Sequence, residues 1–108
     1  MAGNKKINMT ALIKTVAKIH LFTGTGMRKN PFKSGYRPLF DFSQAKTKIS
    51  GQINLINSES FEPGKSGVVE ITFIRGIISD RYFKVGEVFS FGEGTHALGK
   101  GQIIQIIA

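Results

Sequence analysis

The segment Gly35-Tyr36-Arg37-Pro38-Leu39-Phe40-Asp41-Phe42 combines a loop with the start of a short aromatic strand. Side chains alternate between the two faces of an extended chain, so Phe40 and Phe42 share one face and Asp41 lies on the other. Fifty residues after Phe42 comes a glycine-rich segment, Gly92-Glu93-Gly94-Thr95-His96-Ala97-Leu98-Gly99-Lys100-Gly101. The glycines at 92–94 predict a turn that leads into a final strand. Together these segments predict short strands joined by glycine-containing turns.

Alternating apolar residues elsewhere predict further strands. Ala17, Ile19 and Leu21 share one face of an extended segment, and Lys18 and His20 share the other. Six strands and thirteen glycines, with no helix beyond a short candidate at Met9–Val16, predict an all-β antiparallel barrel or sandwich. The expected strands cover residues 14–22, 39–43, 47–55, 68–75, 85–91 and 98–107.

The last of these strands is apolar on both faces over Ile103–Ile107. It is therefore expected to be either covered or an exposed edge that forms an interface. We expect residues 1–13 to be a basic N-terminal extension, disordered or forming a short helix, and residues 14–108 to form a single β-barrel domain.

Composition excludes several classes of function. The 108 residues suffice for one domain, and the absence of cysteine excludes disulfides and thiolate chemistry. Only two isolated histidines, His20 and His96, are present, without the spacing of a metal site, so no cofactor is expected. Lys14 and Lys18 interrupt the only apolar run near the N-terminus, which predicts a cytoplasmic chain without a signal peptide.

Positive charge is concentrated in the first half of the chain. Residues 1–48 hold ten basic residues and one acidic residue, a balance of +9, whereas residues 49–108 hold five basic and six acidic residues, a balance of −1. Such asymmetry points to a nucleic acid, an anionic membrane or an acidic protein surface as partner. A solvated basic surface that aids solubility is the alternative interpretation.

An ordered series of segments resembles the C-terminal, third domain of bacterial elongation factor Tu. The match covers about residues 14–107 and implies a six-stranded antiparallel closed β-barrel. The segments that carry it are Val16–Phe22 as the opening strand, 30–38 as the following loop, Ile49-Ser50-Gly51 as a bend, Pro63-Gly64 as a turn, and 91–101 as the terminal hairpin.

The resemblance implies binding of the acceptor and T-stem of aminoacyl-tRNA. By motif, it places Ser50, Gly51, Glu93 and Gly94 at the RNA, although for each glycine taken alone a turn or bulge is the favoured explanation. Lys29, Lys33, Arg37, Lys46 and Lys48 are candidate phosphate ligands. The sequence departs from the family pattern where Leu39 replaces a glutamine and where Gly92 and His96 replace arginines.

Catalysis is not expected. The chain lacks the G-x-x-x-x-G-K-[ST] motif, and the loop 24–29 has neither its glycine spacing nor its strand-to-helix context. Asp41 is expected to pair with Arg37 or another base rather than to act as a general base.

Two partner hypotheses remain open alongside a third possibility, that the chain is a fragment of a longer factor. One is a tRNA or other structured RNA. The other is a protein partner, with the chain acting as a decoy of the factor's third domain, such as a regulator or immunity-type protein. Its partner would be a translation factor, or a toxin that docks on elongation factor Tu.

Overall fold

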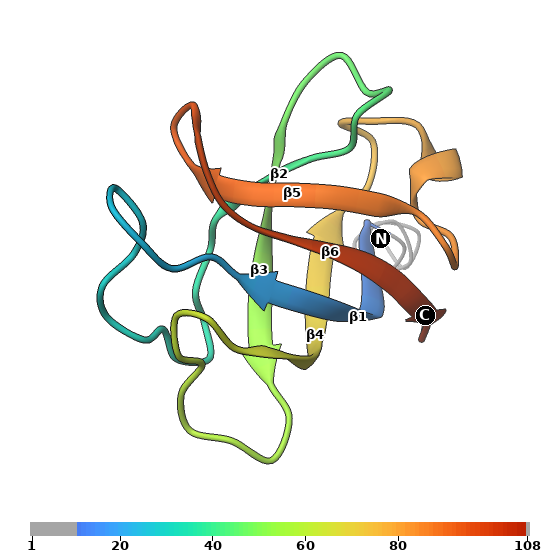
Figure 1. Ribbon diagram of the computed structural model, residues 1–108. Helices are drawn as coiled ribbons and strands as arrows, with labels where there is room; N and C mark the ends of the chain where they lie inside the picture. The colour runs from blue at the N-terminus through green and yellow to red at the C-terminus, as the bar shows by residue number, and fades with distance from the viewer. Residues whose placement is uncertain (1–10, 108) are drawn as a thin grey trace.

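The computed structural model describes residues 11–107, which form six β-strands and one turn of 3₁₀-helix. The strands are β1 (Leu12–Leu21), β2 (Leu39–Asp41), β3 (Ile49–Leu55), β4 (Ser66–Ile74), β5 (Val88–Glu93) and β6 (His96–Ile106), and the 3₁₀ turn η1 (Asp80–Tyr82) precedes β5. Figure 1 shows β5, β6 and β1 crossing in front of β3 and β4.

The strands close into an antiparallel barrel in the order β1-β4-β3-β2-β5-β6. This confirms the six-stranded closed barrel and decides between barrel and sandwich. The final strand β6 pairs with β1 on one side and β5 on the other, so it is not an edge. Its outward residue Ile104 nevertheless remains 44% exposed.

The alternation expected from the sequence fills the interior of the barrel. Ala17, Ile19 and Leu21 of β1 are buried, as are Phe40 and Phe42 around β2. Aromatic rings occupy the centre, where Phe40 contacts Phe73 edge-on with ring centroids 5.0 Å apart. A barrel this small has no room for a channel, and its side chains form one packed core.

Two glycines of β6 make room for these rings. A Cβ on Gly101 would lie 2.7 Å from Ile19 Cγ2 and 2.8 Å from Phe89 Cζ. A Cβ on Gly99 would lie still closer to Phe91. The glycines at 99 and 101 therefore serve packing across the β5–β6 and β1–β6 pairs.

The first strand begins earlier than the sequence indicates. Leu12 and Ile13, assigned to the extension, pair with Ile74 and Phe73 of β4. The helix candidate Met9–Val16 is therefore wrong from Leu12 onward, because Ile13 is needed in the core and the β4 pairing satisfies its backbone. The rest of the expected extension, residues 1–10, lies outside the described residues. Between residues 11 and 107 no helix has the length and hydropathy needed to cross a bilayer.

Candidate nucleic-acid interface

The turn between β5 and β6 is the centre of the candidate site. Glu93 ends β5, His96 begins β6, and Gly94 between them has a positive φ of 61°, which glycine adopts without steric cost. The turn projects from one end of the barrel, on the same side as the long loop that follows β1 (Figure 1). Loop and turn are joined by side-chain contacts.

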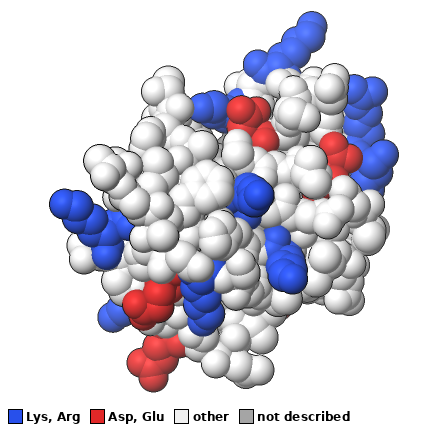
Figure 2. Space-filling model, in the orientation of Figure 1, with Lys and Arg blue, Asp and Glu red and all other residues white. Residues whose placement is uncertain are grey.

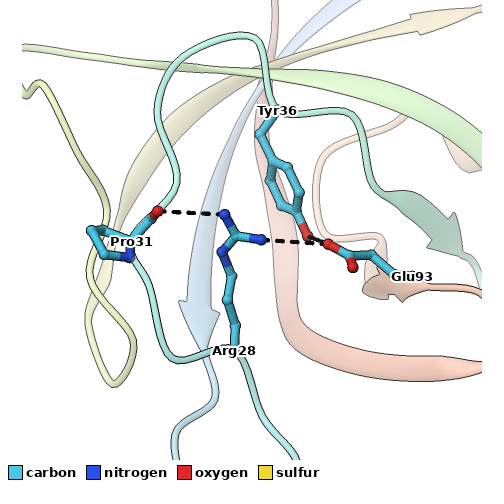
Figure 3. A network of polar contacts seen from close by, with 4 residues as sticks. All are labelled: Arg28, Pro31, Tyr36 and Glu93. Carbon is cyan, nitrogen blue, oxygen red and sulfur yellow. Dashed lines mark hydrogen bonds and ion pairs between the residues drawn. The ribbon is translucent and has the colours of Figure 1, made fainter.

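Glu93 is held by a cluster of polar contacts, here called the Glu93 cluster, formed by Arg28, Pro31, Tyr36 and Glu93 (Figure 3). The Tyr36 hydroxyl donates to Glu93 Oε2 at 2.9 Å. Arg28 Nη1 lies 3.5 Å from the same oxygen, and its Nη2 donates to the Pro31 carbonyl at 3.4 Å. The Arg28 guanidinium also stacks over the Tyr36 ring, 4.9 Å from its centroid. The cluster fixes the loop against the turn.

Tyr36 remains a hydrogen-bond donor throughout the physiological range. Burial raises the pKa of its hydroxyl well above the ordinary value, and the hydrogen bond to Glu93 and that carboxylate's negative charge raise it further. The nearby Arg28 cation lowers it by a smaller amount. The phenol therefore stays protonated and keeps donating to Glu93.

Two further bonds bring more of the chain to this turn. His96 Nε2 donates to the Gly26 carbonyl at 2.8 Å, which ties the loop to the start of β6. Lys48 Nζ donates to the Gly94 carbonyl at 3.2 Å, which brings the loop between β2 and β3 to the tip of the turn. Three segments distant in sequence thus meet at one end of the barrel.

Several of the candidate RNA-contacting residues gather here. Ser50 is exposed on β3 and pairs with Leu39, which pairs in turn with Gly92 at the base of the turn. Ser50 therefore lies two strands away from Gly92. Lys48 directly precedes the strand of Ser50, and Gly94 directly follows the strand of Gly92. Lys29 and Arg37 are exposed beside Arg28 and Tyr36 on the loop that the Glu93 cluster fixes. Lys33 is also exposed, but its neighbours Phe32 and Ser34 contact Phe61 and Leu55, so it lies near the other end of β3.

Two candidates differ from these residues. Gly51 is buried, and a Cβ there would come within 2.9 Å of the Phe40 and Phe73 rings, so packing explains this glycine and its contact with RNA stays a prediction. Lys46 is exposed but lines a separate hollow with Ile77 and Arg81. Lys46 lies in the loop between β2 and β3, and among the described residues it is Lys48, two residues later, that bonds to the β5–β6 turn.

Glu93 and Asp41 have surroundings that the sequence did not indicate. Glu93 was expected to face RNA, and its carboxylate instead accepts the bonds of the Glu93 cluster while 59% of the side chain stays exposed. Within residues 11–107, Asp41 forms no ion pair with Arg37, so the pairing expected from the sequence was wrong. Asp41 points outward from β2, opposite the buried Phe40 and Phe42.

Arg28, Tyr36 and His96 are side chains of the candidate site that the sequence analysis did not assign to it. Tyr36 and Glu93 are 57 residues apart, and His96 and Gly26 are 70 residues apart, so no local spacing reveals either contact. The available signal was chemical, namely an arginine and a tyrosine in the basic loop and a single acid on the turn.

On the face that Figure 2 shows, basic side chains are spread over the surface and acidic side chains lie among them. No family model matches this chain.

Proposed function

We propose that this barrel is a non-catalytic, cytoplasmic RNA-binding domain that grips an A-form stem, such as the acceptor and T-stem of a tRNA, at the β5–β6 turn. The resemblance to the third domain of elongation factor Tu motivates the choice of RNA. The observation that carries the proposal is the position of Lys48, whose ammonium group bonds to the Gly94 carbonyl at the tip of this turn. Exposed Lys29 and Arg37 lie next in sequence to Arg28 and Tyr36 of the Glu93 cluster.

The charge at this end favours a polyanion. Lys29 and Arg37 are exposed and have no acidic partner among residues 11–107, and Lys48 bonds only to the Gly94 carbonyl. The nearby carboxylate, Glu93, is already bound to Arg28 and Tyr36. The uncompensated cations are therefore available to phosphates.

The shape of the turn suits an RNA stem. Proteins recognise A-form helices through phosphates, 2′-hydroxyls and the wide, shallow minor groove. Gly94 has no side chain and no neighbour within 4 Å of where a Cβ would lie, so backbone can approach the groove closely. Ser50 offers a short hydroxyl on the adjoining sheet.

The test is fluorescence anisotropy of a labelled acceptor–T-stem minihelix titrated with the protein at low and physiological salt. A duplex DNA of equal length is the nucleic-acid control. Lys48→Ala should weaken RNA binding and reduce the slope of log affinity against log salt by about one. Lys84→Ala is the matched control, because Lys84 is exposed and precedes β5, at the far end of that strand from the turn.

Binding that survives physiological salt, prefers RNA and depends on Lys48 supports the proposal. Equal affinity for RNA and DNA that disappears at physiological salt refutes it. So does a Lys84→Ala variant that loses as much affinity as Lys48→Ala, since a diffuse charge effect would then explain the binding.

A protein partner is the second candidate, supported by apolar residues exposed far from the turn. Leu12 and Ile74 face each other across the β1–β4 pair and are 51% and 45% exposed. Ile107, also 45% exposed, bonds through its amide to the Lys14 carbonyl beside them. A decoy that mimics a translation factor would use such a surface. A Leu12→Ser/Ile74→Ser variant that still captures the same translation factor at physiological salt would exclude this surface.

A further inference from the structure

A groove of about 570 Å³ crosses the outside of the barrel over β1, β6 and β5. It is much larger than the hollow of about 90 Å³ beside the β5–β6 turn, with which it shares Asp41 and Ser90. Its volume falls within the range of sites that bind small molecules. The RNA proposal makes no use of its central residues.

One row of polar side chains runs across this groove in direct cross-strand register. Asp41 on β2 pairs with Ser90 on β5, and Ser90 pairs with Lys100 on β6. Lys100 pairs with His20 on β1, and His20 pairs with Ser66 on β4. Directly paired residues on one face have Cβ atoms about 5 Å apart. The row therefore sets a carboxylate, an ammonium, an imidazole and two hydroxyls side by side.

The charged groups of the groove have no partners among the described residues. Among residues 11–107, neither a hydrogen bond nor an ion pair engages the side chains of Lys18, Lys100 or Asp41. His20 uses Nδ1 in a 2.8 Å contact with Ser66 Oγ, which leaves Nε2 free. His20, Ser90 and Asp41 are each half-buried in the groove wall, so a ligand would meet them partly shielded from water.

The two ends of the row differ in charge. Lys18 neighbours this row, because it pairs with Gln102 two positions from both Lys100 and His20. Two ammonium groups and an imidazole thus surround one end, which suits a phosphate. Asp41 lies two strands from Lys100, about 10 Å across the sheet, and can accept a hydrogen bond from a hydroxyl or amino group.

We propose that this groove binds a small phosphomonoester that carries hydroxyl groups, with its phosphate at Lys18, Lys100 and His20 and a hydroxyl at Asp41. Sugar phosphates and nucleoside monophosphates share this chemistry and have about the required length. The groove adjoins the turn proposed to bind RNA through Asp41 and Ser90, but Lys48 and Gly94 do not line it.

The experiment is a titration of the ¹⁵N-labelled full chain, followed by amide chemical shifts, with four probes. These are ribose 5-phosphate, adenosine monophosphate, adenosine and inorganic phosphate. The first two should give saturable shifts at the amides of residues 18–20, 90 and 100–102, and their relative affinity tells a sugar phosphate from a nucleotide. Adenosine, without the phosphate, should bind at least tenfold more weakly than its monophosphate.

Variants separate the two ends of the site. Lys100→Ala should weaken the binding of both organic phosphates at least tenfold, and Lys84→Ala should leave it unchanged. Asp41→Asn should weaken ribose 5-phosphate binding and leave inorganic phosphate binding unchanged. All three positions are outward-facing, and the amide spectrum of each free variant reports that it is folded.

Three results would overturn the proposal. The first is the absence of saturable shifts in the groove with either organic phosphate. The second is inorganic phosphate binding as tightly as both of them, with no effect of Asp41→Asn. The third is an equal loss of affinity in Lys84→Ala and Lys100→Ala. Because the RNA test depends on Lys48, each proposal can fail while the other stands.

Discussion

Replacement of Gly99 by alanine tests whether this barrel depends on close contact between β6 and the aromatic core. Gly99 pairs with Phe91 on β5 and with Leu21 on β1. A Cβ at this position would lie 2.2 Å from Phe91 Cζ and 2.6 Å from the His20 carbonyl oxygen. The first obstacle is a core ring and the second is backbone of the neighbouring strand.

The cost follows from how far these atoms would have to move. Non-bonded carbons sit about 3.5–4.0 Å apart, so the Phe91 ring must retreat by more than about 1 Å. It cannot do so freely, because Phe40 packs behind it with ring centroids 5.9 Å apart. Overpacked cores lose about 1–3 kcal/mol, and a clash with backbone in addition to a ring places Gly99→Ala near 3 kcal/mol.

Urea unfolding followed by circular dichroism measures this free energy, and a loss near 3 kcal/mol corresponds to a melting temperature about 13 °C lower. Gly67→Ala is the matched control, because the nearest atom to its added Cβ is Phe61 Cε2 at 3.2 Å. Both substitutions restrict the unfolded chain equally, so their difference isolates the clash. If Gly99→Ala costs no more than Gly67→Ala, the packing argument is refuted.

Three smaller perturbations test other contacts. The raised folded-state pKa of Tyr36 stabilises the wild type below the unfolded pKa, and this stability is lost as the pH rises above about 10. In Tyr36→Phe, the unfolding free energy should therefore fall less steeply above about pH 10. Equal slopes of the two proteins in urea unfolding at several pH values would contradict this. Thr15→Val should lower the unfolding free energy by about 1 kcal/mol in thermal unfolding, because it removes the buried 2.9 Å hydrogen bond from the Thr15 hydroxyl to the Ile71 carbonyl. If Thr15→Val loses no more stability than Thr15→Ser, which keeps the hydroxyl, that hydrogen bond is unimportant. Gly94→Ala should cost about 1 kcal/mol through its positive φ alone, and an unchanged melting temperature would argue against that turn geometry.

Much of the fold was predictable because alternation reports burial directly. Val69, Ile71 and Phe73 are spaced by two and all are buried, and the same holds for Phe89 and Phe91. The start of β1 was missed because Leu12 is exposed, so alternation alone gives no clear boundary there. The prediction that the barrel is closed rested on the resemblance to the third domain of elongation factor Tu, because alternation of apolar residues fits a sandwich equally well.

The candidate site was only partly predictable because its contacts are long-range. Lys48 and Lys46 look alike in sequence, yet only Lys48 reaches the Gly94 carbonyl. The two residues of the bend at Ser50-Gly51 face opposite sides, with Ser50 exposed and Gly51 buried, which their adjacency in the sequence does not reveal. The row across the outer groove depends on strand order, which brings Asp41 beside Ser90 and His20 beside Lys100.

The pairing of the first strand with the last also determines how the domain responds to force. Because β1 and β6 are antiparallel, Thr15 near the start of one lies opposite Ile106 at the end of the other. Tension applied through residues 11 and 107 would therefore load the hydrogen bonds of this pair one after another, beginning with that from the Ile107 amide to the Lys14 carbonyl. A barrel closed in this way separates first at the β1–β6 pair, one hydrogen bond at a time. Its resistance to stretching is therefore set by single hydrogen bonds even though its core is continuous.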